Sequence, residues 1–311
     1  MRDDLMSTPP HSFHGLVAAP HTPFLPDLSL NLRAVEPQAR FLLDGGVNGV
    51  FISGSTGEGP SLTLAERLEL TRCWMEVARG TSLGVVVHVG SNSLPDACEL
   101  AAQAQQCGAD AIGTMAPYYF KPTSVADLID FCAPIAAAAP ELPFYYYDYP
   151  AMTGVRLPVT DLLLQGRERI PTLAGAKCSN GDLTQLQHCL RAGDGRFNIL
   201  LGCDELLLAG LALGVRGAVG TTFNVAAPLY RRIIADFHEG NLAAAQAAQW
   251  QAARMVQILA GYGLVPASKA MMRMLGIDCG PVRPPLRNLT TNELEALQRE
   301  LVALAVLKPK P

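Results

Sequence analysis

The chain has little charge for its length, and that charge is dispersed. Only 17% of its 311 residues are Asp, Glu, Lys or Arg, and the formal net charge is −4. Because there is no run of Lys and Arg, neither nucleic acid nor an anionic membrane surface is an expected partner. No uninterrupted apolar segment is long enough to span a bilayer, and residues 1–13 lack the apolar stretch of a signal peptide. We therefore expect a soluble, cytoplasmic protein.

Metal-binding and disulfide motifs are also missing. The eight cysteines form no C-x-x-C pair, and the six histidines form no H-x-x-H or H-E-x-x-H arrangement. Most of the cysteines lie inside apolar patterns, as Cys73 does in LTRCWMEVA. We interpret them as reduced, small hydrophobic residues and expect a mechanism without a metal.

Eight short apolar runs alternate with longer amphipathic segments over roughly the first 240 residues. The runs are too continuous for half-exposed strands and are typical of parallel strands covered on both faces. They begin at Leu16, Gly49, Gly84, Ala111, Pro143, Leu173, Phe197 and Gly217. Helical patterns lie between them, with start signals such as Thr63-x-x-Glu66 and Ser93-x-x-Asp96. This order predicts an α/β fold, a (β/α)₈ TIM barrel.

A doubly wound open sheet is the alternative architecture. It would place G-x-G-x-x-G at the first strand–helix turn, whereas the first run here ends in Pro20-His-Thr-Pro23. After residue 240 the strand pattern stops, and three helices are expected: Asn241–Ala260, Pro266–Leu275 and a segment capped by Thr290-x-x-Glu293. The predicted organisation is therefore a disordered segment (1–14), a catalytic barrel (15–240) and a C-terminal helical extension packed on it (241–311).

Chemistry in such a barrel belongs at the carboxyl ends of the strands. Reading those ends in order gives the candidate site: Ser55-Thr56-Gly57-Glu58, Tyr118-Tyr119, Tyr147, Lys177-Cys178-Ser179, Gly202-Cys203-Asp204-Glu205 and Thr221-Thr222. Lys177 stands out because it alone of the five lysines ends an apolar strand, LeuAlaGlyAlaLys. Partial desolvation there would lower the amine's pKa and make it a nucleophile. A lysine that extends out of the barrel or pairs with a carboxylate is the alternative.

The other strand ends each have a functional and a structural interpretation. The turn GlySerThrGlyGluGly (54–59) could hold a carboxylate through its backbone N–H groups and the hydroxyls of Ser55 and Thr56, or it could be a plain tight turn. Alternation sends Tyr145 and Tyr147 to one face and Tyr146 to the other, so Tyr147 could shuttle protons or simply pack.

Two polar pairs complete the candidate site. Asp204-Glu205 could bind a polyol or only favour the start of a helix. Thr221-Thr222 could cap a helix or add hydroxyls to the site.

GlySerThrGlyGlu, Tyr-x-x-Pro at 147–150 and the strand-terminal Lys177 together resemble the pyruvate-dependent class I aldolases. This family contains N-acetylneuraminate lyase and dihydrodipicolinate synthase, and the resemblance covers nearly the whole chain. The lyase branch is the more similar, through the segments 136–147, 150–154 and 217–224. The synthases carry an Arg two residues after the proline, where this chain has Met152.

The resemblance implies a lyase that cleaves N-acetylneuraminate, a sialic acid, to pyruvate and N-acetylmannosamine through a Schiff base on Lys177, without a cofactor. A sister aldolase for another 2-keto-3-deoxy sugar acid, a dihydrodipicolinate synthase and a silent binding relative are the alternatives. The resemblance also implies roles for the other candidate residues. Tyr147 and Thr56 would transfer protons, and Ser55 and Thr56 would hold the pyruvyl carboxylate. Asp204 and Glu205 would bind the sugar hydroxyls, Ser179, Gly202 and Thr221 would line the sugar side, and Tyr119 would reach a neighbouring subunit of a homotetramer. Asp148 departs from the family's neutral residue or His, and Thr221 from a frequent Ser.

Overall fold

Eight parallel strands form a closed barrel in this computed structural model, which describes residues 12–308. Each strand pairs with the next in the chain, and β8 returns to β1. The strands are β1 Gly15–Ala18, β2 Gly49–Ile52, β3 Gly84–His88, β4 Ala111–Met115, β5 Phe144–Asp148, β6 Leu173–Cys178, β7 Asn198–Leu201 and β8 Gly217–Gly220. The predicted TIM barrel is therefore confirmed, and the open sheet is excluded.

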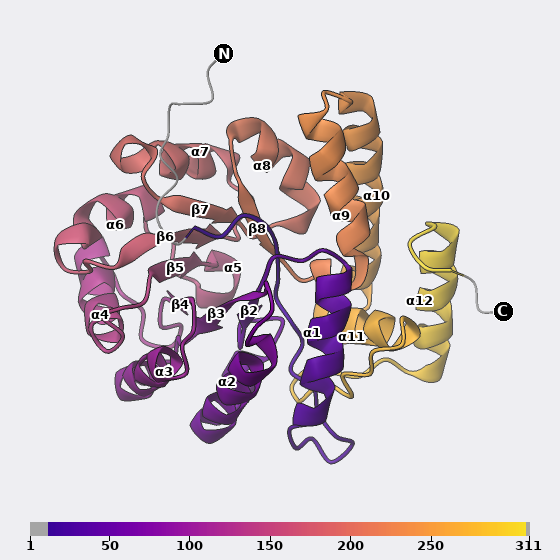
Figure 1. The fold of residues 1–311 in the computed structure, drawn as a ribbon, viewed down its shortest axis with the longest axis horizontal. Helices are drawn as coiled ribbons and strands as arrows, with labels where there is room; N and C mark the ends of the chain where they lie inside the picture. Colours follow the sequence, from indigo (N-terminus) through magenta and orange to yellow (C-terminus); the bar gives the residue numbers. More distant parts are fainter. Residues whose placement is uncertain (1–11, 309–311) are drawn as a thin grey trace.

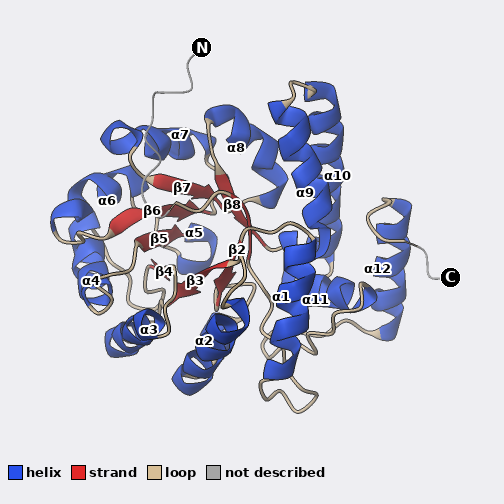
Figure 2. Ribbon diagram, viewed as in Figure 1, coloured by secondary structure: helices blue, strands red, loops and turns tan. Residues whose placement is uncertain are grey.

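Helices surround this barrel and cover its outer face (Figures 1 and 2). On the outer face lie α1 Val35–Asp44, α2 Leu64–Ala78, α3 Leu94–Gln106, α4 Val125–Ala137, α6 Val159–Gln165, α7 Leu183–Arg191, α8 Leu207–Leu213 and α9 Phe223–His238. The short helix α5 Pro150–Thr153 lies instead at one end of the barrel, where most of its residues line the cavity described below. Thr63 and Glu66 form the predicted reciprocal capping box of α2, whereas Ser93 accepts from the Asp96 N–H without a reciprocal bond. No helix among residues 12–308 is long and apolar enough to cross a membrane.

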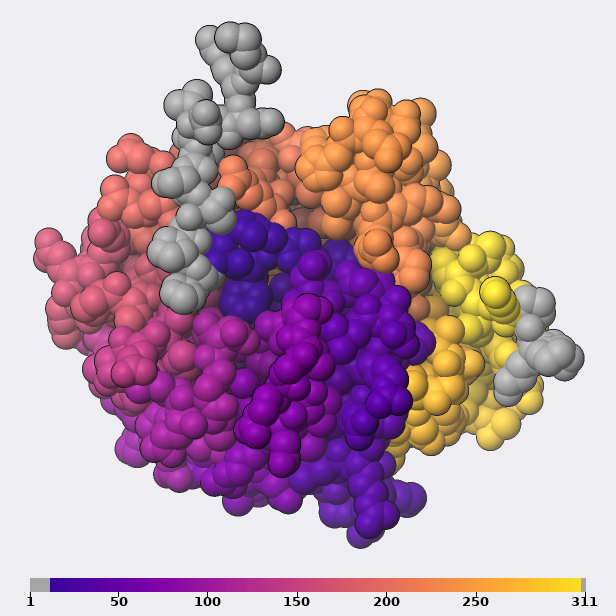
Figure 3. Space-filling view, in the orientation of Figure 1, coloured from indigo at the N-terminus to yellow at the C-terminus, as the bar shows by residue number. Residues whose placement is uncertain are grey.

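Three further helices follow the barrel at the places that the sequence pattern indicates. They are α10 Leu242–Gly261, α11 Leu264–Met274 and α12 Thr291–Ala303, the last with the expected Thr290–Glu293 capping box. α10 packs along α9, and α11 contacts both α9 and α10. Figure 3 shows this C-terminal part, orange to yellow, lying against the rest of the molecule without a gap.

The barrel interior is filled by aromatic and branched side chains, and its amino-terminal end is closed. Tyr145 and Tyr147 lie in the interior cluster, and Tyr146 lies in the outer core, as the alternation predicts. Phe13 exchanges two hydrogen bonds with the Asn198 side chain, which also accepts from the Tyr145 hydroxyl. Order in the chain therefore begins before residue 15, while residues 1–11 of the expected disordered segment lie outside the described part. Because Phe13 packs against the interior cluster at the amino-terminal end of the barrel, the carboxyl ends of the strands form its accessible mouth.

Candidate active site

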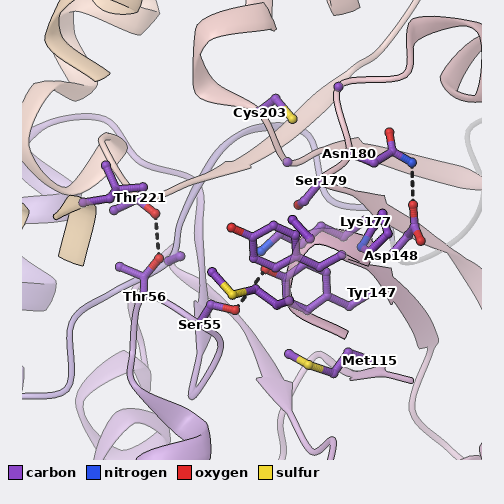
Figure 4. Close-up of a pocket in the computed structure, with 18 of the residues that line it drawn as sticks. Ser55, Thr56, Met115, Tyr147, Asp148, Lys177, Ser179, Asn180, Cys203 and Thr221 are labelled. Atoms are coloured by element: carbon purple, nitrogen blue, oxygen red, sulfur yellow. Dashed lines mark hydrogen bonds between the residues drawn. The ribbon is translucent and has the colours of Figure 1, made fainter. Parts of the chain in front are cut away.

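The mouth of the barrel opens into a cavity of about 1700 Å³. Of the ten residues to which the sequence analysis gives a role in substrate binding or catalysis, nine line it: Ser55, Thr56, Tyr147, Lys177, Ser179, Gly202, Asp204, Glu205 and Thr221. Figure 4 shows several of these side chains converging from different strands. Tyr119 does not line the cavity; its side chain is 76% exposed on the loop after β4. The volume exceeds that of an ordinary small-ligand site, roughly 300–1,000 Å³, so it leaves room for a ligand longer than pyruvate.

Lys177 lies near the end of β6 with its amine inside the barrel mouth. The residue is only 4% exposed, and its Nζ lies 3.9 Å from the centre of the Tyr147 ring and 4.5 Å from that of Phe51. No carboxylate within the described residues forms an ion pair with it. Burial lowers the pKa of Lys177 from 10.5 to about 7, although Asp204 and Cys203 act in the opposite direction. Both structural alternatives, a solvent-directed lysine and a salt-bridged lysine, are therefore wrong.

Tyr147 is the cross-strand partner of Lys177 on β5. Its hydroxyl lies 3.4 Å from that of Ser55, and its ring meets Phe51 edge-on. Burial raises the pKa of Tyr147 above its usual value of 10, with the Ser55 hydrogen bond acting in the opposite direction. The phenol therefore stays protonated near neutral pH and can both donate and accept a hydrogen bond.

The expected relay from Tyr147 to Thr56 is not formed in this structure. The Thr56 hydroxyl instead shares a hydrogen bond of 2.6 Å with the hydroxyl of Thr221, the residue that follows β8 (Figure 4). Ser55 occupies the place beside the phenol because the turn after β2 presents successive hydroxyls in different directions. Among residues 12–308, no backbone carbonyl accepts from the N–H groups of Ser55 and Thr56, which leaves both donors for a bound anion.

Position 202 requires glycine because the Ser179 side chain lies directly against its Cα. A Cβ at this position would lie 1.7 Å from the Ser179 Oγ, so any larger residue would displace that hydroxyl. Ser179 is fixed in turn by its N–H, which donates to the Asp148 carbonyl (2.9 Å). The two residues therefore form a compact wall between β6 and β7.

Asp204 and Glu205 differ in environment, although they are adjacent. Asp204 is 8% exposed, and its Oδ2 accepts from both the N–H (2.7 Å) and the hydroxyl (2.5 Å) of Thr222, the residue that precedes α9. Burial raises the pKa of Asp204 to about 6, while the bonds from Thr222 and the charge of Lys177 oppose the rise. Glu205 is exposed, and its carboxylate has no partner in the described chain. Both residues lie in the first turn of a helical segment, the 3-10 turn Asp204–Leu206, as the helix-start interpretation expects, but neither side chain caps that turn. Asp204 binds the residue before α9 instead, and the Glu205 carboxylate stays available for a ligand.

Several cavity residues were given no role by the sequence interpretation, among them Tyr149, Asp148 and Asn180. Tyr149 stacks on Tyr147, with ring centroids 5.7 Å apart. The alternation that separates the earlier tyrosines extends to this position, so the signal was present. Asp148 accepts from the Asn180 amide at 2.6 Å, and burial raises the pKa of this carboxyl to about 6. Asn180 carries no motif of its own, so only the folded chain identifies it.

Comparisons with known proteins agree with this geometry. The model of the Dihydrodipicolinate synthetase family matches residues 12–304. The N-acetylneuraminate lyase of Gallus gallus is 39% identical over 90% of this chain and 92% of its own. The structure of a sialic acid aldolase, or N-acetylneuraminate lyase, from Aliivibrio salmonicida has a TM-score of 0.92 and 37% identity over 96% of this chain and 98% of its own. That of the Proteus mirabilis N-acetylneuraminate lyase has the same TM-score at 36% identity, over 95% and 100% of the two chains.

The family model matches nearly the whole chain, and the relatives named above align with it over most of both chains. The chain belongs to the dihydrodipicolinate synthetase family.

Proposed function

We propose that this chain is an N-acetylneuraminate lyase, a class I aldolase that cleaves the open-chain sugar acid to pyruvate and N-acetylmannosamine. The observation that carries the proposal is the buried, unpaired amine of Lys177, whose pKa of about 7 makes it a nucleophile near neutral pH. It lies in a cavity large enough for a nine-carbon sugar acid. The curated relatives named N-acetylneuraminate lyase support the choice of substrate.

The reaction begins when the neutral Lys177 amine attacks the C2 ketone of the substrate. Loss of water gives a protonated imine, which accepts the electron pair of the C3–C4 bond as that bond breaks. The C4 hydroxyl must lose its proton in the same step. Because the Tyr147 phenol is protonated, we assign it a relay role: it passes its proton on through the Ser55 hydroxyl or the substrate carboxylate while it accepts the proton of the C4 hydroxyl. The enamine that remains takes up a proton at C3, and water then hydrolyses the imine to release pyruvate and the free amine.

The two halves of the substrate are assigned to opposite sides of Lys177. The N–H groups and hydroxyls of Ser55 and Thr56 hold the pyruvyl carboxylate. On the sugar side, Glu205 and the free oxygen of Asp204 accept hydrogen bonds from the polyol, beside the wall of Ser179 and Gly202 and the Thr221 hydroxyl.

A sister aldolase acting on another 2-keto-3-deoxy sugar acid has the same Lys177 chemistry and differs only on the sugar side. Dihydrodipicolinate synthesis is disfavoured by Met152, 63% exposed at the cavity, where a second carboxylate would need a cation. Pyruvate release measured across a panel of sugar acids separates these activities. The proposal predicts the highest kcat/KM for N-acetylneuraminate; a higher value for an unacetylated deoxy sugar acid would contradict it.

We further propose that the chain acts as a cytoplasmic homotetramer built from dimers, in which Tyr119 approaches a neighbouring subunit's site. Tyr119 and Phe120 are 76% and 85% exposed and meet edge to face on the loop after β4. Two adjacent exposed aromatic rings are typical of a protein interface.

A further inference from the structure

A second lysine is as deeply buried as Lys177, and the mechanism does not use it. Lys269 of α11 forms an ion pair with Glu58, with Nζ and Oε1 2.8 Å apart and side chains 2% and 1% exposed. Lys269 also donates to the carbonyl of Pro281 at 2.7 Å. Because burying a charge is strongly unfavourable unless it is paired, an ion pair in this position requires both partners to be held in place.

Glu58 belongs to the same turn as the proposed carboxylate ligands. Its backbone is left-handed (φ 53°, ψ 28°), a conformation that is uncommon outside glycine. Its N–H donates to the Ser55 carbonyl at 3.1 Å, so the direction of the Glu58 side chain and the placement of Ser55 are linked through one tight turn. On the barrel side, the Thr22 hydroxyl donates to the Gly57 carbonyl at 2.6 Å. The Glu58 carboxylate is therefore the outer anchor of this turn.

The second oxygen of that carboxylate is held by Arg283, in the segment between α11 and α12. The backbone N–H of Arg283 donates to Glu58 Oε2 at 2.8 Å. Its guanidinium group donates to Glu66 and to the carbonyl oxygens of Leu28 and Ser61. The ring of Phe24 contacts both cations, at 4.4 Å from the Lys269 Nζ and 4.3 Å from the Arg283 Cζ.

We propose that Lys269 and Glu58 are positioning residues, and that with Arg283 they form a buried clamp by which the C-terminal extension fixes the turn that carries Ser55 and Thr56. The inference rests on the proposed function, because it assigns to that turn the binding of the pyruvyl carboxylate. The clamp gives the C-terminal extension a role in substrate binding. Without the positive charge of Lys269, the left-handed turn at the barrel mouth would hold the buried Glu58 carboxylate without a counter-charge. Neither Lys269 nor Glu58 takes part in the proposed chemical steps, so loss of the clamp should weaken pyruvate binding more than it slows those steps.

The test uses the full chain and inorganic borohydride trapping of pyruvate, with the pyruvate concentration for half-maximal trapping as the readout. The principal variant is the double change Glu58→Gln/Lys269→Met, which removes both buried charges together and leaves neither uncompensated. It should fold with a Tm near that of the wild type, reach full trapping, and need about 10-fold more pyruvate. The steady-state KM for N-acetylneuraminate should rise by more than kcat falls.

Glu58→Gln alone is the second variant in case the double change does not fold. Its amide oxygen can still accept from the Arg283 N–H, and Lys269, whose pKa burial already lowers, can lose its proton. It too should need more pyruvate, by a smaller factor. Arg169→Met, which breaks the exposed pair with Asp130 at 2.9 Å, is the matched control and should leave the half-saturating concentration unchanged.

The outcomes separate the clamp from the proposed function. Folded clamp variants that trap pyruvate with the wild-type concentration dependence would overturn the clamp, even if their Tm falls, since that is the pattern of a purely structural ion pair. Wild-type protein that fails to trap pyruvate at all would overturn the proposed function and the clamp with it. Supporting results are a raised half-saturating concentration in a folded variant together with an unchanged control.

Discussion

Lys177 and Tyr147 face each other across the β5–β6 ladder, with the lysine nitrogen 3.9 Å from the centre of the tyrosine ring. Burial lowers the pKa of Lys177 and favours the neutral amine, and it outweighs the opposing effect of Asp204 and Cys203. The same contact places the Tyr147 ring directly beside the Lys177 amine. In the proposed mechanism, this one pair of residues supplies both the amine and the neighbouring proton carrier.

The nucleophile assignment predicts that Lys177→Met abolishes borohydride trapping of pyruvate. Methionine keeps most of the packing against Phe51 and Tyr147, and it removes an unpaired buried amine, so Tm should not fall. Mass spectrometry of the reduced adduct and its peptides checks the site. Trapping that persists in the variant would assign the imine to another lysine, with the loop residue Lys121 the next candidate.

The lowered pKa of Lys177 predicts the pH dependence of imine formation in the free enzyme. The neutral fraction of the amine increases with pH and levels off above its pKa, about 7 here against 10.5 ordinarily. The trapping rate at subsaturating pyruvate should therefore fall about tenfold per pH unit below pH 7 and flatten above it. A rate that continues to climb to pH 9 or 10 would mean that the amine is not desolvated in solution.

Asp204 raises the pKa of Lys177, so its removal should move this profile. In Asp204→Asn the midpoint of the trapping rate is expected at lower pH than in the wild type, because the charged form of Lys177 loses a stabilising neighbour. The measurement is the same pH series on the variant. A midpoint shifted upward would contradict the electrostatic assignment.

Tyr147→Phe tests the proton relay. The ring, its contact with Phe51 and its stack with Tyr149 remain, and only the hydroxyl near Ser55 is lost. We expect kcat to fall by roughly 10²–10⁴-fold while pyruvate trapping is partly retained. Turnover close to that of the wild type would make Tyr147 a packing residue.

Glu205→Gln is the cleaner test of the polyol assignment, because the Glu205 carboxylate is free whereas Asp204 also binds Thr222. Loss of charge-assisted hydrogen bonds worth roughly 1.5–3 kcal/mol would lower kcat/KM for N-acetylneuraminate by about 10- to 150-fold. Trapping of pyruvate alone and Tm should be unchanged. Asp204→Asn should lower both kcat/KM and Tm. Unaltered kinetics in both variants would remove the basis for preferring this lyase to its sister aldolases.

The proposed tetramer predicts a specific effect at the exposed loop. Wild-type protein should sediment as four chains, and Tyr119→Ala with Phe120→Ala should shift the distribution toward smaller species, because the two exposed rings would lose their partner surface. Analytical ultracentrifugation measures both. A monomeric wild-type protein with full activity would contradict the assembly and the intersubunit role of Tyr119.

The sequence by itself determined the barrel and singled out the lysine that we propose as the nucleophile. Continuous apolar runs between amphipathic helices fit only parallel strands covered on both faces, and the carboxyl ends of such strands meet at one mouth. Lys177 could be singled out because the chain is poor in lysine and this one ends a strand. Alternation with period two was enough to separate Tyr145 and Tyr147 from Tyr146.

Only the tertiary structure decided how much each polar group is buried and which partner it meets. The spacing of Thr56 and Tyr147 could not show that Thr56 pairs with Thr221, because that contact joins elements 165 residues apart. No sequence motif marks Lys269, yet folding places it beside Glu58, which lies 211 positions earlier in the chain. Desolvation and long-range pairing depend on the distances between segments, and these are fixed only when the core packs.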